Sequence, residues 1–181
     1  MIELTTHFAD TVPMPGEIET IVFALDRSRA QFAWKAGGLD AEALARRPLP
    51  SRITLGGLVK HLALVEELFT IDLTGEAPGS PLAEADHEDP DWAWRTAAEH
   101  TPDELYAMWR DAAAKSRAAL LRVTADGGLD QPAKYWRNND GETINLRRRM
   151  TDLHDEYARH VGHADLLREA VDGLVGEDPP R

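Results

Sequence analysis

The sequence predicts an all-α protein, a four-helix bundle with a long crossover between its second and third main helices. In four separate segments, apolar residues recur three and four positions apart, which is the period of an amphipathic helix. No segment keeps the apolar-polar alternation that is typical of strands. Residues 76–100 are rich in Pro, Asp, Glu, Gly and Ser, and this stretch is too long for a tight helix hairpin. We therefore expect main helices at about 17–36, 55–74, 102–126 and 144–172, in a single domain that spans residues 1–181.

The first helix is expected to begin after Gly16 and to end at Gly37, because glycine commonly stops a helix. Its apolar stripe consists of Ile18, Ile21, Leu25 and Phe32. After it, Asp40 can cap a brief helical turn over residues 41–44 before two prolines interrupt the chain. The first connection is therefore predicted to be a short linker.

The second helix can be capped by Thr54 and is expected to end near Gly75. In the crossover that follows, we expect one further helical turn near Trp92 and Trp94. The third helix begins with the sequence TPDE at residues 101–104, in which the Thr caps, the Pro occupies the first helical position and the Glu closes a capping box. This start is the sharpest boundary signal in the chain.

The last helix is expected to open at Thr143 and to run to Gly173. Before it, Gly127 and Gly128 end the third helix. The sequence NDG at residues 139–141 indicates a tight turn, with two short extended pieces on either side of it. A short loop excursion is therefore expected between the last two helices.

The charge balance argues against nucleic-acid and membrane partners. The chain has 20 basic and 32 acidic residues, a net charge of -12 that would repel phosphate groups. The basic run at residues 147–149 is interpreted as a solvated helix face. No signal peptide is visible, and charged residues interrupt every apolar stretch before the ~20 residues that a membrane-spanning helix needs. We therefore expect a cytoplasmic protein.

The chain contains no cysteine, which limits the chemistry available to it. A disulfide framework, a thiolate-bound metal and a cysteine nucleophile are all excluded. A metal would have to be held by histidine and carboxylate groups, and thiol chemistry would need a thiol supplied from outside.

Two ionisable residues fall on the apolar side of the last helix. Glu156 and His160 share a face with Leu153 and Leu167, because the four are separated by three, four and seven positions. An ionised carboxylate buried without a partner costs several kcal/mol, so an inward Glu156 calls for a cation, a proton or a hydrogen-bonding partner. A bound metal would satisfy this requirement.

On the second helix, His61 lies in the apolar stripe of Leu58, Val65 and Leu68. Two facing helices can then supply three ligands, which leaves an open coordination position of the kind found in catalytic zinc sites. The residues alone leave other readings open. Glu and His four apart also occur as a surface pair, and a lone inward histidine is often a hydrogen-bonded core residue.

The sequence contains four further histidines that are not expected to bind the metal, and one, His163, that is an alternative ligand. His163, three positions after His160, could replace one of the ligands, but we favour a position behind them. His154 is rotated away from His160 and is expected to be exposed or to pack between helices. We expect no ligand role for the three histidines in loop-like contexts, His7, His87 and His100.

Nearby carboxylates and indoles are assigned more ordinary roles. Glu66 and Asp165 are expected on helix flanks as solvated carboxylates; the alternative is that either one orients a ligand imidazole. Trp92, Trp94 and Trp109 are expected to pack in the core and crossover, although Trp92 or Trp94 could wall the mouth of the site.

Two segments, residues 51–63 (SRITLGGLVKHLA) and residues 156–169 (EYARHVGHADLLRE), resemble the DinB-like superfamily. The branch that they resemble contains small actinobacterial-type proteins related to the mycothiol-dependent maleylpyruvate isomerase. The resemblance extends over about residues 17–172 and implies a zinc or nickel ion. In this family the metal is held by one His of the second helix and two residues four apart on the last. His61, Glu156 and His160 match the Glu-His variant of that pattern, and Gly162 matches a family Gly after the final ligand.

The resemblance implies a thiol-dependent transferase, in which the metal activates mycothiol or a similar thiol toward an electrophilic substrate. Maleylpyruvate isomerisation itself is not expected, because that isomerase has an additional C-terminal domain that contributes to its active site, whereas this sequence stops soon after its last predicted helix. The alternatives are a metal-dependent hydrolase and a non-catalytic, stress-associated metal-binding bundle that forms a homodimer. A di-iron bundle is set aside, since its repeated Glu-x-x-His ligands are not found in the sequence.

Overall fold

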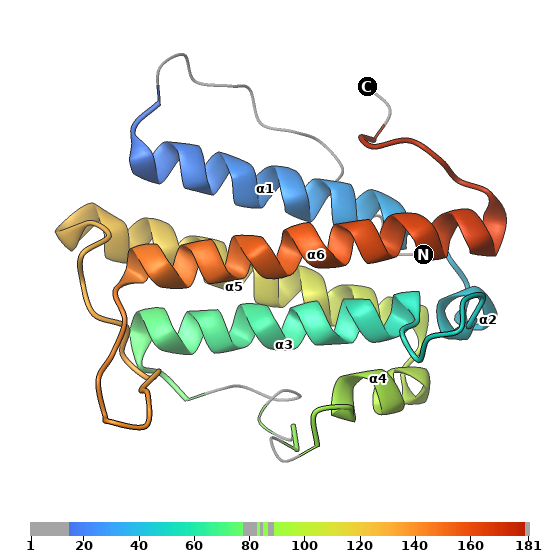
Figure 1. The fold of residues 1–181 in the computed structure, drawn as a ribbon, viewed down its shortest axis with the longest axis horizontal. Coiled ribbons are helices and arrows are strands. Elements are labelled where there is room, and N and C mark those ends of the chain that lie inside the picture. Colours follow the sequence, from blue (N-terminus) through green and yellow to red (C-terminus); the bar gives the residue numbers. More distant parts are fainter. Residues whose placement is uncertain (1–14, 78–82, 84, 87–88, 180–181) are drawn as a thin grey trace.

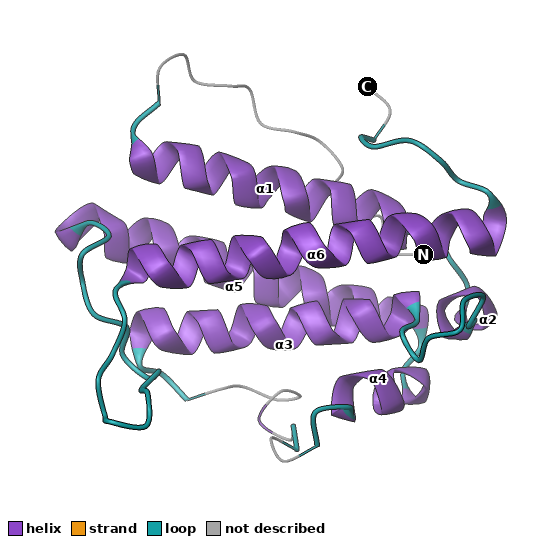
Figure 2. Cartoon of the chain, in the orientation of Figure 1, coloured by secondary structure: helices purple, strands orange, loops and turns teal. Residues whose placement is uncertain are grey.

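The computed structural model describes residues 15–77, 83, 85–86 and 89–179. Within these ranges the chain forms four long helices, α1 (Glu17–Ala36), α3 (Leu55–Thr74), α5 (Pro102–Gly127) and α6 (Leu146–Asp172). Shorter helical pieces are α2 (Ala41–Ala45), α4 (Trp92–Thr96) and the 3-10 turn η2 (Ala97–Glu99). The described residues contain no strand, only an isolated bridge between Pro132 and Asn145 (Figure 2). The all-α prediction is confirmed.

The long helices form a bundle in which α1 and α6 run in one direction and α3 and α5 in the other (Figure 1). Neighbouring helices in the bundle are α1 and α6, α6 and α3, and α3 and α5. Because α3 and α5 are parallel, the chain must return along the bundle between them, and α4 and η2 lie on this return. The long crossover is therefore a requirement of the topology.

Local capping explains where α3 and α5 begin. The Thr54 hydroxyl accepts a hydrogen bond of 3.0 Å from the Gly57 amide. At α5, the Thr101 amide donates to the Glu104 carboxylate at 2.7 Å and the Glu104 amide donates back to the Thr101 hydroxyl at 3.3 Å. At the other end of α3, Gly75 adopts a left-handed conformation with φ of 75°. All three signals were predicted from the sequence.

The start of α6 differs from the prediction by two residues. Its cap is Asn145, whose side chain accepts a 3.0 Å hydrogen bond from the Arg148 amide. Thr143 instead donates its hydroxyl proton to the Ala133 carbonyl at 3.0 Å and so ties the preceding loop together. Both residue types can cap a helix, and the contact with Ala133 engages Thr143 elsewhere. The predicted tight turn is present, with Gly141 at φ of 80°.

The core is a continuous apolar cluster that involves all four long helices. Its aromatic members pack edge to face, and the ring centroids of Phe32 and Trp109 are 5.4 Å apart. This contact joins α1 to α5. The two helices that carry the predicted ligands, α3 and α6, lie side by side in the bundle.

None of the helices in the described ranges is long and apolar enough to cross a membrane.

Candidate metal centre

Ligand atoms of His61, Glu156 and His160 converge where α3 packs against α6. One ligand atom from each residue lies within 4.8 Å of the other two. The spacing of four within α6 stacks Glu156 and His160 on one face, and the packing of α3 on α6 brings His61 to that face. The structure thus brings together the three residues predicted from the sequence.

The distances within this cluster suit a small divalent cation. The Nε2 atoms of His61 and His160 lie 3.3 Å and 3.2 Å from the same oxygen, Oε2 of Glu156. With ligand bonds of about 2.0–2.2 Å, two ligand atoms of a tetrahedral zinc site lie about 3.3–3.6 Å apart. Without a cation, each Nε2 would have to carry a proton and donate it to that oxygen. Both the donor types and their spacing therefore fit a metal held by these residues.

The environment keeps Glu156 ionised. Hydrogen bonds from His160 and then His61 hold the pKa of its carboxyl well below the usual range, against the opposing effect of partial burial. Solvent still reaches the cluster, because the side chain of Glu156 is 31% exposed and that of His61 is 23% exposed, whereas that of His160 is 8% exposed. An anionic ligand is thus presented at a place that a small molecule can reach.

His163 contacts His160 and is not one of the three residues whose ligand atoms converge. Its Nδ1 lies 3.2 Å from Nδ1 of His160, on the opposite side of that ring from Nε2. Burial, and then the charges of His160 and Arg159, lower the pKa of His163, which favours a neutral ring that can accept a hydrogen bond. A proton held on His160 Nδ1 leaves Nε2 free to bind a metal.

Arg159 engages the other oxygen of the carboxylate. Its Nη1 lies 3.4 Å from Oε1 of Glu156, and its Nη2 lies 3.0 Å from Asp155. One carboxylate oxygen of Glu156 therefore faces the two imidazoles while the other faces a guanidinium. This division leaves a single oxygen directed at the candidate metal position.

Comparison with known proteins identifies the family. The sequence model of the mycothiol-S-transferase family matches residues 20–173, which includes α3 and α6 with all three candidate ligands. The chain belongs to the mycothiol-S-transferase family. This result confirms the DinB-like resemblance of the two ligand-bearing segments.

The fold of this mycothiol-S-transferase family member also occurs in a solved structure. A crystal structure described as the conserved protein of a locus from Enterococcus faecalis superposes with a TM-score of 0.69 and 17% sequence identity. The match covers 87% of this chain and 98% of that chain. At this identity the likeness establishes the fold alone. No curated protein gives a significant sequence match.

Trp94 forms one wall of the cluster. Its ring stacks on His61 with centroids 4.9 Å apart and an interplanar angle of 23°. Gly57 makes this packing possible, since a Cβ at that position would lie 2.7 Å from the Trp94 ring. The sequence prediction that Trp92 or Trp94 could wall the site mouth is met by Trp94. Trp109 lies in the core, as predicted.

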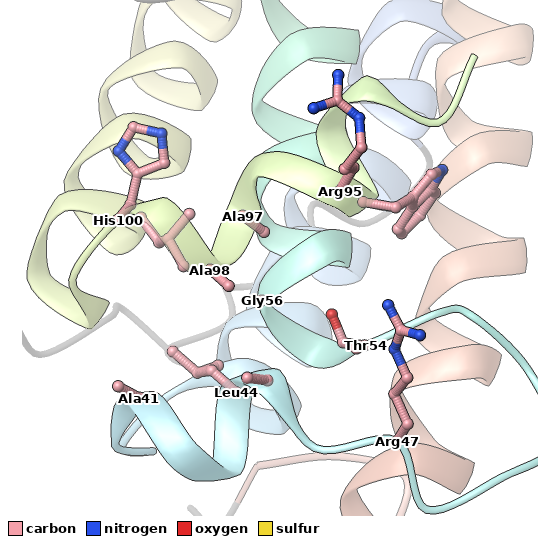
Figure 3. Close-up of a pocket in the computed structure, with 12 residues that line it drawn as sticks. Ala41, Leu44, Arg47, Thr54, Gly56, Arg95, Ala97, Ala98 and His100 are labelled. Carbon is pink, nitrogen blue, oxygen red and sulfur yellow. The ribbon is translucent and has the colours of Figure 1, made fainter. Parts of the chain in front are cut away.

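A pocket of about 130 Å³ lies against Trp94, between α2, the first turn of α3 and the crossover. Figure 3 shows Arg47 extending toward Thr54, whereas the side chains of Arg95 and His100 point away from α2. The remaining lining consists largely of small and apolar residues. Trp94 thus contributes both to this pocket and to the contact with His61.

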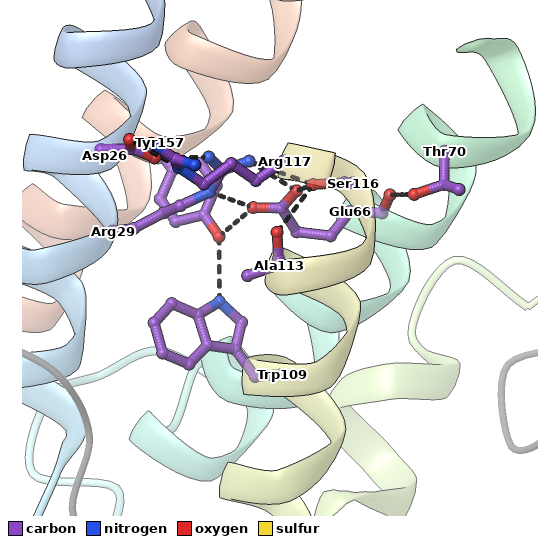
Figure 4. A network of polar contacts seen from close by, with 9 residues as sticks. All are labelled: Asp26, Arg29, Glu66, Thr70, Trp109, Ala113, Ser116, Arg117 and Tyr157. Atoms are coloured by element: carbon purple, nitrogen blue, oxygen red, sulfur yellow. Dashed lines mark hydrogen bonds and ion pairs between the residues drawn. The ribbon is translucent and has the colours of Figure 1, made fainter. Parts of the chain in front are cut away.

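Of the two carboxylates predicted on helix flanks, the structure contradicts the prediction for Glu66 only. Glu66 is completely buried in the bundle, where it binds Arg29 and other residues, so its expected solvated position is wrong (Figure 4). Asp165 is half-buried and forms a 3.1 Å ion pair with the buried Lys35 of α1. Each carboxylate pairs with a cation on α1, and sequence spacing along one helix does not reveal such a partner. Neither carboxylate contacts a candidate ligand.

The remaining histidines and basic residues stay outside the cluster. His154 is half-buried, and His100 places its Nε2 3.0 Å from Nζ of Lys60. His7 and His87 lie outside the described residues. The basic run agrees with the solvated-face interpretation at Arg147 and Arg148, whose side chains are partly or largely exposed and pair with carboxylates. For Arg149 that interpretation is wrong, because its largely buried side chain pairs with the buried Asp72 of α3.

Proposed function

We propose that this chain is a metal-dependent thiol transferase that holds zinc or nickel through His61, Glu156 and His160. The observation that carries the proposal is the approach of two imidazole nitrogens, at 3.3 Å and 3.2 Å, to one carboxylate oxygen. Membership of the mycothiol-S-transferase family supports a thiol cosubstrate. The absence of cysteine supports it as well, because the sulfur nucleophile must then come from outside the chain.

When bound, a divalent ion supplies Lewis acidity that lowers the pKa of a thiol, so that the thiolate forms near neutral pH. The residues of the chain serve this chemistry in distinct ways. Glu156 provides the anionic charge that retains a cation, and the two imidazoles are neutral donors. Three protein ligands leave room for a sulfur atom, and the exposed side of Glu156 and His61 is where it would enter.

Transfer would form a bond between the thiol sulfur and an electrophilic atom of the second substrate, while the bond from that atom to its leaving group breaks and the leaving group departs with the electron pair into solvent. The thiol proton passes to solvent, which reaches Glu156 and His61. Trp94 covers His61 on one face and excludes water from that side of the ring. We propose mycothiol or a related low-molecular-weight thiol as the cosubstrate. An electrophilic small molecule would then be the acceptor.

The test begins with the metal content of the purified protein and of two variants. We expect about one ion per chain in the wild type. The variant His160→Ala should lose the metal while keeping its helical circular dichroism. His154→Ala removes a histidine of the same helix outside the cluster and should keep the metal. A wild-type protein that takes up neither zinc nor nickel would refute the metal site.

The second step distinguishes an enzyme from a structural metal protein. Mycothiol is titrated into the cobalt-substituted protein, and a thiolate-to-metal charge-transfer band is expected to appear. An analogue of the thiol with a hydroxyl in place of sulfur is the control and should leave the spectrum unchanged. If the metal is present but no thiol alters its spectrum, the transferase proposal fails and a non-catalytic metal-binding bundle is supported.

A further inference from the structure

A buried carboxylate joins the four long helices at the centre of the bundle. Glu66 of α3 accepts hydrogen bonds from Arg29 Nε at 2.7 Å and from Arg29 Nη2 at 2.9 Å. The Tyr157 hydroxyl of α6 donates to the same carboxylate at 2.6 Å, and the Ser116 hydroxyl of α5 also contacts it. Figure 4 shows these groups converging on Glu66 from the surrounding helices. The four residues therefore form one polar network.

The direction of the hydrogen bond from Tyr157 is determined by its other partner. The indole Nε1 of Trp109 can only donate, and it lies 2.9 Å from the Tyr157 oxygen. The hydroxyl proton of Tyr157 is therefore left to point at Glu66. The contact is thus a fixed link from α6 to α3.

This link lies close to the candidate ligands on both helices. Tyr157 directly follows Glu156 and comes three residues before His160, whereas Glu66 comes five residues after His61. At about 1.5 Å of rise per residue, these separations along the helix axes stay below about 8 Å. The hydrogen bond therefore joins the two ligand-bearing helices beside the place where their ligands meet.

We propose that the hydrogen bond from Tyr157 to Glu66 positions α6 against α3 and thereby sets the distances from Glu156 and His160 to His61. Tyr157 is then a positioning residue for the metal centre. The inference rests on the proposed metal binding. Its physical basis is that metal sites tolerate ligand displacements of only about 0.2 Å, so a small slide or rotation of α6 changes the coordination.

Ser116 provides a matched comparison within the same network. Its hydroxyl contacts the same carboxylate as Tyr157, but it lies on α5, which carries none of the three candidate ligands. Tyr157→Phe and Ser116→Ala each remove one hydroxyl from Glu66. Both variants should lower thermal stability. Only Tyr157→Phe should disturb the metal centre.

The experiment compares the cobalt-loaded wild type with the two variants by visible absorption, and measures zinc affinity by competition with a chelator. We expect Tyr157→Phe to shift the cobalt bands and to weaken zinc binding about tenfold or more. Ser116→Ala should retain the spectrum and affinity of the wild type. Tyr157→Phe with a wild-type spectrum and affinity would overturn the inference, and so would Ser116→Ala with changes as large as those of Tyr157→Phe.

A further variant keeps the inference testable if Tyr157→Phe fails to fold. Arg29→Met combined with Glu66→Gln removes the ion pair and retains a side-chain oxygen that can accept the hydrogen bond from Tyr157. This double variant is expected to keep the wild-type cobalt spectrum, and a changed spectrum would contradict the positioning role. A wild type that binds neither cobalt nor zinc would instead overturn the proposed function, and this inference with it.

Discussion

Nε2 of His61 lies 3.3 Å from Oε2 of Glu156, although the two residues are 95 positions apart in the chain. The contact exists only because α3 packs against α6. A metal held between these residues would bind the folded bundle and not the unfolded chain. Metal binding and folding stability are therefore expected to be coupled.

Metal should stabilise the wild-type protein by a calculable amount. A ligand present at 100 times its Kd and bound only by the folded state adds about 2.7 kcal/mol to the free energy of unfolding. For a chain of this size we expect the Tm to rise by roughly 5–10 °C, and a chelator should reverse the rise. Differential scanning calorimetry with and without zinc measures this shift. The same rise in His160→Ala would show that zinc acts elsewhere.

His163 is expected to support His160 from behind. Its removal by His163→Ala takes away the hydrogen-bonding partner of His160 Nδ1, 3.2 Å away, so the ligand ring is less well oriented. Loss of such a partner typically weakens metal affinity about 10–100-fold. Isothermal titration calorimetry against His154→Ala, which should match the wild type, measures the effect. Complete loss of binding would instead identify His163 as a ligand.

Metal affinity should fall on acidification. The slope of its logarithm against pH gives the number of ligand groups that take up a proton when the metal leaves. Histidine binds a metal only as neutral imidazole, so protons compete with the metal for both rings. The carboxyl pKa of Glu156 is held well below its usual range, so this group stays ionised at pH 5. At acid pH the logarithm of the affinity should therefore fall with a limiting slope of about two per pH unit, one proton for each imidazole. A slope near three would mean that Glu156 also takes up a proton.

Breaking the buried ion pair of Glu66 should be costly. Glu66→Gln preserves the shape of the side chain but removes the fully buried countercharge of Arg29, which keeps only its 3.0 Å contact with the partly exposed Asp26. Such a change typically costs about 3–5 kcal/mol of unfolding free energy. Arg148→Ala, which removes an exposed pair with Asp152, should cost no more than about 0.5 kcal/mol. Urea denaturation compares the two, and equal losses would contradict the buried role of Glu66.

Two glycines near the candidate site should respond oppositely to alanine. At Gly57 a Cβ would lie 2.7 Å from the Trp94 ring, so Gly57→Ala is expected to destabilise the fold by about 1–3 kcal/mol. At Gly162, within α6, no atom lies within 4 Å of an added Cβ. Gly162→Ala should therefore add up to about 1 kcal/mol, because alanine favours helix. Chemical denaturation followed by circular dichroism measures both, and a neutral Gly57→Ala would contradict the close packing of Trp94.

The extents of the long helices were largely predictable from local signals. The capping box of Thr101 with Glu104 and the left-handed Gly75 both act within one helical turn of the boundary that they define. The start of α6 was missed by two residues because Thr143 and Asn145 are both competent caps. A contact with Ala133, ten residues before Thr143, decided between them.

The network around Glu66 was not anticipated, yet the sequence contained a signal for it. Glu66 lies four positions after Leu62 and three before Phe69, on the buried stripe of α3, and Arg29 lies between Leu25 and Phe32 on the stripe of α1. Opposite charges on two core-facing stripes indicate a buried pair. Whether Arg29 and Glu66 pair with each other depends on which helices are neighbours in the bundle. Helix periodicity contains no information on which helices are neighbours.

Local periodicity and capping were sufficient for the all-α class, for the main helices and for the inward side of α6 that bears Glu156 and His160, because these properties arise within one or two turns of a single helix. The same signals left three questions open. They did not determine which nitrogen of His61 contacts Glu156, which residue covers the His61 ring, or which cation pairs with Glu66. Those answers depend on contacts between residues 33 to 95 positions apart. Such contacts are decided by the packing of the whole core, where side chains from separate helices must fill one volume together.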